Sequence, residues 1–179
     1  MPVLDLIRVY QPTDPDDERT RDRFIDFVSR QPNCLERSLA HWHITASAWV
    51  SNTKGTQVAM VHHRKLNRWL QPGGHMDGCA EAETVARREV EEETGLTDLK
   101  LIDPVPFDLD IHPIPKFRGV SAHEHFDVRF AFRASGDLSL RLSDESHDVS
   151  WIPIDKLDDY DPDPSILRMR TKWLSLDLP

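Results

Sequence analysis

Residues 74–96, GHMDGCAEAETVARREVEEETGL, decide the fold that we expect for this chain. They begin within a Pro-Gly-Gly loop and predict a helix over about residues 81–94, which ends at Gly95 because glycine readily takes the left-handed backbone of a helix end. On a helical wheel, apolar residues share one stripe with two carboxylates, and a third carboxylate flanks it. The stripe consists of Ala82, Val85, Ala86, Glu89 and Glu93, with Glu92 beside it. We therefore expect a core-facing surface that continues as carboxylates.

Carboxylates crowded near the end of a helix need compensation. Glu89, Glu92 and Glu93 are three and four residues apart, so they repel one another and oppose the helix dipole, at a cost of about a few tenths of a kcal/mol each. Arg88, four residues before Glu92, offsets part of this. Mg²⁺ or Mn²⁺ would offset more because these ions prefer carboxylate and carbonyl oxygens, and the glycine loop leaves its carbonyls unobstructed. The alternative interpretation is a solvated acidic face.

The segment resembles the Nudix box, G-x5-E-x7-R-E-U-x-E-E-x-G-U, where U is aliphatic. Eight of its nine fixed positions agree in register: Gly74, Arg88, Glu89, Val90, Glu92, Glu93, Gly95 and Leu96. A Trp-x-x-Pro-Gly-Gly loop at residues 69–74 precedes the box, as in Nudix proteins, and the likeness extends over roughly residues 43–157. The resemblance implies a Nudix fold, in which a mixed β-sheet is combined with the box helix and flanking helices.

The same resemblance implies an activity and a metal cofactor. Nudix proteins typically hydrolyse a nucleoside diphosphate linked to another moiety, using Mg²⁺ or Mn²⁺. By similarity, Glu92, Glu93 and the Gly73 carbonyl would bind the metal. Glu89 would act as base or as a further ligand, and Arg88 would hold the carboxylates in place. We therefore expect a Nudix pyrophosphohydrolase.

One fixed position departs from the family pattern, because the first glutamate of the box is replaced by Ala80. Alanine can neither bind a metal-bound water nor brace the loop. Three explanations stay open. Asp77, Glu81 or Glu83 compensates, the site is weakened, or the protein is a Nudix fold that binds nucleotides without turning them over.

An acidic residue outside the box is a further catalytic candidate. Many Nudix enzymes place one in a late loop about six residues before a Trp that starts the next strand, where it acts as base or extra ligand. Glu145, six residues before Trp151, resembles this residue, and an ordinary loop acid is the alternative. Glu124 is a rival, but on a strand it would point to the apolar side with Phe126 and would need a bulge.

Several residues around the box are candidates for substrate or metal binding. His123, His125 and Asp127 share one face of an alternating strand, a spacing that could hold a metal or contact a phosphate, although structural histidines are commoner. A basic patch that could meet phosphates, or form a solvated hairpin end, contains His62, His63, Arg64, Lys65 and Arg68. We therefore name Arg64, Arg68, His75, His123, His125 and Asp127 as substrate-binding candidates. Trp49, Trp69 and Trp151 could stack on a base, but core packing is the stronger expectation.

The chain around the box predicts an α+β fold or an α/β/α sandwich with a mixed sheet. We expect a helix before Pro32, a β-hairpin over residues 43–62, a Pro-interrupted edge or bulged strand over 99–111, a strand over 122–134, and a strand over 149–154. Pro113 and Pro115 predict a loop. Pro164 predicts the start of a last helix with Ile166, Met169, Trp173 and Leu174 on one stripe. At 179 residues we expect one domain: a helical extension (1–40), a core (41–160) and a C-terminal helix (161–179).

Composition narrows the class of partner. The chain has 22 Lys plus Arg against 31 Asp plus Glu, a formal charge of -9, which disfavours binding to a nucleic-acid duplex. Two cysteines without a CxxC pair favour a reducing compartment, and no signal peptide or membrane-length apolar run is evident. We therefore predict a cytoplasmic protein that binds a small nucleotide-type diphosphate, with a homodimer as one option.

Three functional hypotheses follow. The first is a metal-dependent hydrolase that cleaves a pyrophosphate linkage in a nucleoside triphosphate, a nucleotide sugar such as ADP-ribose, or a similar compound. The second, motivated by Ala80, is a non-catalytic Nudix-fold nucleotide sensor. The third is an enzyme similar to isopentenyl-diphosphate isomerase, which shares a Gly-His pair like Gly74-His75. That family has a catalytic Cys directly before the pair, where this chain has Gly73, so we rank it last.

Overall fold

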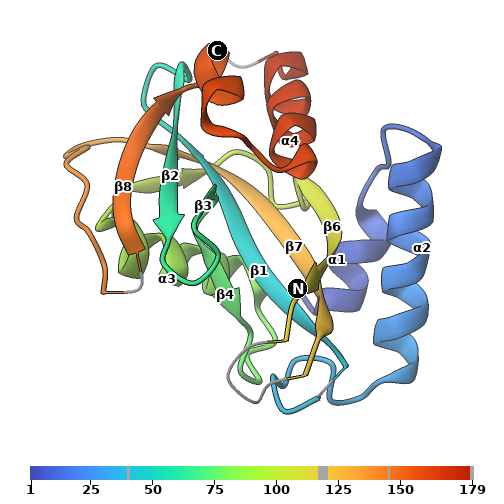
Figure 1. Ribbon diagram of the computed structural model, residues 1–179. Helices are drawn as coiled ribbons and strands as arrows, with labels where there is room; N and C mark the ends of the chain where they lie inside the picture. Colours follow the sequence, from blue (N-terminus) through green and yellow to red (C-terminus); the bar gives the residue numbers. More distant parts are fainter. Residues whose placement is uncertain (40, 117–120, 145, 178–179) are drawn as a thin grey trace. The chain divides into compact units, whose positions relative to one another are not determined.

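The computed structural model describes residues 1–39, 41–116, 121–144 and 146–177 (Figure 1). Its elements follow the order α1 (Val3–Val9), α2 (Pro15–Arg30), β1 (Trp42–Ser51), β2 (Gln57–His63), β3 (Arg68–Leu70), β4 (Gly73–His75), α3 (Ala82–Thr94), β5 (Leu99–Leu101), β6 (Asp108–Ile114), β7 (His123–Ala134), β8 (Ser146–Pro153), the 3-10 helix η1 (Ile154–Tyr160) and α4 (Pro164–Ser175). This combination confirms the expected α+β class.

One sheet contains all eight of these strands. Five strands follow the order β3-β2-β1-β7-β5, and the three remaining strands β4, β6 and β8 pair with β1, β7 and β2. Contacts divide the chain into two compact units: a first unit of Met1–Ser47, Gly73–Ala86 and Asp103–Phe130, and a second unit of Ala48–Pro72, Arg87–Ile102 and Ala131–Pro179. Strands β1 and β7 and helix α3 each contribute residues to both units. The two units are described separately below.

In the first unit, two N-terminal helices lie side by side (Figure 1). Helix α2 confirms the helix predicted before Pro32, and Asp14 caps it by accepting hydrogen bonds from the backbone N–H groups of Asp16 and Asp17. Its Phe24 and Phe27 rings contact the Phe126 ring of β7, at centroid distances of 5.0 and 4.4 Å. The sequence did not predict helix α1, whose seven residues are too few to show a clear helical period.

Short strands also define this unit. Strand β4 pairs antiparallel with β1, opposing Gly73 to Ser47. A Cβ atom added at Gly73 would overlap the Ser47 side chain and crowd the backbone of β1, so this close approach requires glycine. Strand β6 pairs with β7 and includes Pro113, so the expectation of a loop at Pro113 is wrong. Proline fits there because the described pairings of β6 involve β7 alone, so β6 is an edge strand.

In the second unit, β2 lies between β3 and β8 and pairs antiparallel with both (Figure 1). Strands β1 and β2 form the predicted hairpin. In its connection the Asn52 side chain accepts a hydrogen bond from the Thr56 N–H, and Gly55 has a positive φ of 70°. The edge position of β5 at one end of the sheet path also agrees with the sequence prediction.

Two helix ends in the second unit follow the sequence signals. Gly95, which has a φ of 77°, follows the last residue of α3, and the Arg141 N–H donates to the Thr94 carbonyl. Helix α4 begins with Pro164 after the capping residue Asp163. Its predicted stripe is correct for Ile166, Met169 and Trp173, which are buried, but Leu174 is wrong because that side chain is 68% exposed. None of the described helices is long and apolar enough to cross a membrane.

Candidate active site

Helix α3 presents the predicted carboxylate stripe. Ala82, Val85 and Ala86 are fully buried, and the same face continues into Glu89 and Glu93. Glu93 is only 8% exposed, and the Glu89 side chain is 15% exposed. Because burial disfavours the charged form of a carboxylate and a nearby cation favours it, the end of this stripe is a place where a bound cation would be stabilised.

Arg88 is the cation that the sequence assigned to these carboxylates. Its Nη2 donates to Glu89 Oε1 at 2.8 Å, and its Nε lies 3.7 Å from Glu92 Oε1. The Glu92 side chain is 63% exposed, so this second pair contributes little stability by itself. Arg87 points elsewhere, because its guanidinium donates to the Leu99 carbonyl and lies over the Phe132 ring. Arg88 thus orients the carboxylates and neutralises one of their charges.

The residues proposed to replace the missing box glutamate have other contacts. Ala80 is exposed. The Asp77 carboxylate forms an ion pair with Arg37, and Glu81 forms one with the N-terminal amino group at 2.8 Å. Glu83 is half-buried on the first turn of α3. Asp77 and Glu81 are thus engaged in exposed ion pairs, and compensation for the missing glutamate by Asp77, Glu81 or Glu83 stays a prediction.

Gly73 lies in the first unit, whereas Glu89, Glu92 and Glu93 lie in the second. The predicted ligand set that combines them therefore stays a prediction. The packing around Gly73 argues against the isomerase-like hypothesis, which needs a cysteine there, because a side chain at this position would overlap Ser47.

Glu145 and Glu124 are the two acidic candidates outside the box. Glu145 lies outside the described residues. Glu124 continues the regular pairing of β7 with β6, opposite Pro113, without the bulge that a catalytic role would need. Its carboxylate instead accepts a hydrogen bond from Arg23 of α2 at 3.2 Å.

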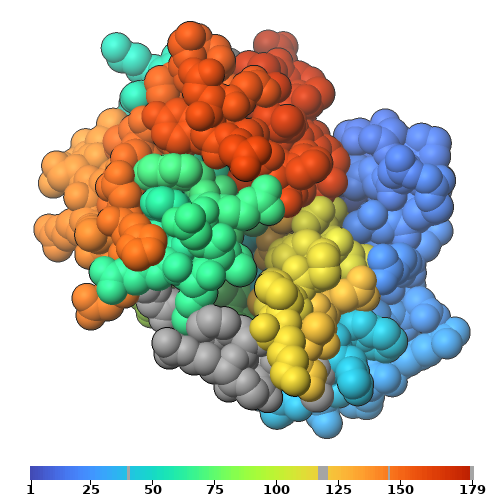
Figure 2. All heavy atoms as spheres, viewed as in Figure 1, coloured from blue at the N-terminus to red at the C-terminus, as the bar shows by residue number. Residues whose placement is uncertain are grey.

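The basic patch before the box lies in the second unit, where several of its side chains are tied to neighbouring elements. His62 stacks on Trp69 at 5.2 Å, Arg64 Nε donates to the Ser146 carbonyl at 2.7 Å, and Arg68 lies 3.5 Å from Asp163. Figure 2 shows this segment (green) against the C-terminal part of the chain (orange to red). These contacts give Arg64 and Arg68 structural roles, and their binding to a substrate stays a prediction.

The tryptophans behave mainly as packing residues. Trp49 is fully buried, as expected for a core residue. The Trp151 indole N–H donates to the Leu138 carbonyl at 2.9 Å. Trp69 is half-buried and also meets Tyr160 edge-on at 5.6 Å.

Asp127 belongs to a buried ion cluster, which the sequence did not reveal. It accepts hydrogen bonds from Thr45 at 2.9 Å, from Ser47 at 2.6 Å and from Arg129 Nε at 2.8 Å. Arg129 also contacts Asp108 at 3.2 Å and Asp110 at 3.0 Å. Burial alone would lower the pKa of Arg129, but these carboxylates outweigh burial and raise it. The carboxylate of Asp127 thus serves Arg129 in this structure, and its role in substrate binding stays a prediction.

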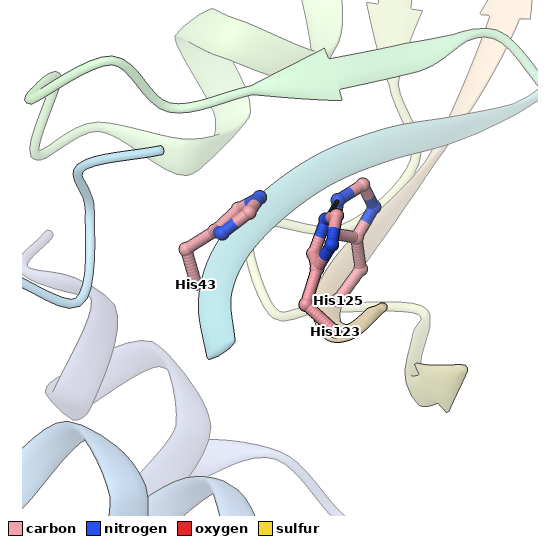
Figure 3. Close-up of side chains that lie close together, drawn as sticks. All are labelled: His43, His123 and His125. Carbon is pink, nitrogen blue, oxygen red and sulfur yellow. Dashed lines mark hydrogen bonds between the residues drawn. The ribbon is translucent and has the colours of Figure 1, made fainter. Parts of the chain in front are cut away.

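The histidines of the same strand face join a larger cluster in the first unit. His123 and His125 of β7 lie close to His43 of β1, with ring centroids between 4.7 and 5.1 Å apart (Figure 3). His75 of β4 and His112 of β6 surround them, at 5.2 and 5.5 Å from the His125 ring. The sequence grouped only the pair on β7 and named His75 as a separate candidate, because the other histidines reach this place through strand pairing.

Burial keeps several of these imidazoles neutral at pH 7. Desolvation lowers the pKa of His125 to about 2 and that of His75 to about 4. The pKa of the buried His43 is lowered for the same reason, although the Leu39 carbonyl opposes the shift. Neutral imidazoles carry a free lone pair, so this cluster offers nitrogen ligands.

Comparisons with known proteins agree with this architecture. The family model described as NUDIX domain matches residues 41–173. No curated protein matches the chain at the level of sequence. The fold class is α+β, and its box helix α3 ends in carboxylates that Arg88 orients. The chain belongs to the NUDIX domain family, and the predicted class, a Nudix pyrophosphohydrolase, agrees with this family.

Solved structures show the same fold. A NUDIX-family hydrolase from Clostridium perfringens is 22% identical, with a TM-score of 0.56 over 74% of this chain and 95% of its own. An Ap4A hydrolase from C. elegans is 14% identical, with a TM-score of 0.59 over 74% of this chain and 95% of its own. The dihydroneopterin triphosphate pyrophosphohydrolase of E. coli is 16% identical, with a TM-score of 0.58 over 72% of this chain and 92% of its own. The Nudix fold predicted from the box is thereby confirmed.

Proposed function

We propose that this chain is a Mg²⁺- or Mn²⁺-dependent hydrolase that cleaves a pyrophosphate linkage in a nucleoside diphosphate derivative. The observation that carries the proposal is the stripe of α3, where the box residues Glu89 and Glu93 continue a buried apolar face. The family match, and the hydrolases of nucleotide-type substrates among similar folds, support the same reaction class.

The residues present fit a hard divalent cation. Glu92 and Glu93 supply carboxylate oxygens of the kind that Mg²⁺ prefers, and Glu89 supplies another that is already oriented by Arg88. We include the Gly73 carbonyl in the ligand set only because the resemblance to the Nudix box implies it. When bound, such a metal lowers the pKa of an attacking water and neutralises charge on the diphosphate.

Side chains of the protein would accept the proton of the attacking water and orient the carboxylates. By its place in the box, Glu89 would act either as the base that accepts a proton or as a further metal ligand, and Arg88 holds its carboxylate at 2.8 Å. Glu145 is a second candidate for the base, on its resemblance to the late-loop acid of Nudix enzymes. Arg88 orients the carboxylates without touching the substrate, so it is a positioning residue.

The test is a screen of nucleoside triphosphates, nucleotide sugars including ADP-ribose, dinucleoside polyphosphates and NADH, each with Mg²⁺ and with Mn²⁺. Glu92→Gln and Glu93→Gln are expected to reduce kcat at least about 100-fold. Glu91→Gln is the matched control, because Glu91 is exposed and lies off the stripe. Circular dichroism verifies that each variant is folded. Full activity in both stripe variants would exclude the proposed site.

Ala80 favours one alternative, a nucleotide sensor that binds without turnover. The same screen separates the two functions when binding is measured beside product formation. Saturable nucleotide binding with no product in either metal would establish the sensor and overturn the hydrolase.

A further inference from the structure

We propose that His43, His123 and His125 form a second metal site, distinct from the carboxylates of the Nudix box, which binds a nitrogen-preferring transition metal such as Zn²⁺. The three residues come from the described part of the first unit, and each offers one ring nitrogen. These three nitrogens all lie within 4.8 Å of one another (Figure 3).

The spacing of the nitrogens approaches that of a coordinated ion. His123 Nε2 and His125 Nε2 are 3.2 Å apart and form a hydrogen bond, which coordination of an ion would replace. Two ligands at the usual Zn–N distance and a tetrahedral angle are separated by about 3.3–3.4 Å, so this pair is already at bonding separation. The His43 nitrogen, at most 4.8 Å from the other two, needs to approach by up to about 1.5 Å, which a rotation of its side chain can supply.

In His43 and His123 the Nδ1 atom, which would not bind the ion, faces a backbone carbonyl, as is usual for metal-binding histidines. His43 Nδ1 faces the Leu39 carbonyl at 3.4 Å, and His123 Nδ1 faces the Ser121 carbonyl at 2.9 Å. A carbonyl can only accept, so Nδ1 of each ring is the nitrogen that carries a proton, and Nε2 is the nitrogen that can offer a lone pair. A ligating histidine usually donates its other N–H to such a carbonyl or carboxylate.

The Nε2 atom of His43 provides an independent indication. His43 is 3% exposed, and this nitrogen is buried with no hydrogen-bond partner among the described residues. Leaving a buried acceptor unsatisfied costs about 1–3 kcal/mol. A metal ion bound by the three rings would satisfy this atom.

The chemistry of the ligands selects the ion. Three neutral imidazoles suit Zn²⁺, Cu²⁺, Ni²⁺ or Co²⁺, whereas Mg²⁺ and Mn²⁺ prefer oxygen. Three protein ligands leave one tetrahedral position for a water or another small ligand. The site shares no residue with the stripe of α3, so it does not depend on the proposed function.

The experiment measures Zn²⁺ binding to the 179-residue chain by isothermal titration calorimetry after removal of metals with EDTA. One ion per chain is expected, in the presence of excess Mg²⁺. Substitution with Co²⁺ should give the intense visible absorption of a tetrahedral site. Saturation with neither ion would overturn the proposal.

Variants locate the bound ion. His43→Ala and His125→Ala should each weaken Zn²⁺ binding at least about 100-fold. His123→Ala should do the same at a half-buried position, which keeps the test decisive if the loss of His43 prevents folding. The control is His41→Ala, because His41 is exposed directly before β1.

Glu93→Gln distinguishes the new site from the Nudix box and should bind Zn²⁺ like the unmodified chain. If all three histidine variants bound Zn²⁺ as tightly as the unmodified chain, or if Glu93→Gln lost Zn²⁺ binding, the ion would bind elsewhere and the proposal would be overturned.

Discussion

Replacing Arg129 with methionine tests the buried ion cluster of the first unit. The Arg129 side chain is 2% exposed and contacts three carboxylates, those of Asp108 at 3.2 Å, Asp110 at 3.0 Å and Asp127 at 2.8 Å. Removing one partner of a buried ion pair costs about 3–5 kcal/mol, because the other charge remains buried. Since three buried carboxylates lose their shared cation together, we expect a loss at the upper end of that range. This is a large share of a total stability of about 5–15 kcal/mol.

The free energy of unfolding is measured by urea titration at pH 7.5, followed by tryptophan fluorescence and circular dichroism. Arg19→Met is the control, because Arg19 is exposed and pairs with Asp16 one turn away, so its loss should cost less than about 1 kcal/mol. Replacing Arg129, Asp108 and Asp110 together by apolar residues of similar volume should recover much of the loss. A cost below about 1 kcal/mol for Arg129→Met, at an unchanged urea dependence, would refute the account of the cluster.

Three further predictions concern the box and its loop. Gly73→Ala should lower the free energy of unfolding by about 1–3 kcal/mol in urea titrations, because its methyl group would overlap Ser47; an unchanged value would mean that β4 moves away from β1 without cost. Ala80→Glu should raise kcat/KM with Mg²⁺ by about tenfold or more in steady-state assays, because it restores a box carboxylate, and no change would show that this position is dispensable here. Mg²⁺ at about 100 times its Kd should raise Tm by roughly 5–10 °C in the unmodified chain and in Glu91→Gln, but not in Glu93→Gln, as measured by differential scanning fluorimetry. An equal rise in all three proteins would place the ion away from the stripe.

Features set by local sequence could be predicted well. The box helix follows from the spacing of Ala82, Val85 and Ala86, and its end follows from Gly95, because helical period and glycine conformation act within a few residues. The start of α4 at Pro164 has the same local origin. Leu174 was misplaced because it lies about 80° around the helix from Ile166, at the margin of the buried stripe.

Features that depend on strand pairing could not be predicted. His43, His75 and His112 lie on three strands, and the pairings of β1 with β7, of β4 with β1 and of β6 with β7 bring them near His125. The buried cluster of Arg129 has the same origin, since alternation along β7 showed a polar face but not the aspartates of β6. Pro113 was misassigned because a proline indicates a loop unless the strand is known to lie at an edge.

The alternating side chains of strand β1 limit where the chain can gain or lose a residue. His43, Thr45 and Ser47 alternate along one face of this strand, the first in the histidine cluster and the other two hydrogen-bonded to Asp127. Inserting or deleting one residue just before Thr45 would turn one part of this face over relative to the other. If the residues before the change shifted, His43 would leave the histidine cluster. If the residues after it shifted, Thr45 and Ser47 would lose their hydrogen bonds to Asp127. We expect natural and engineered length variants to accumulate in the turn at residues 52–56 instead, where one more residue leaves this face of β1 in register.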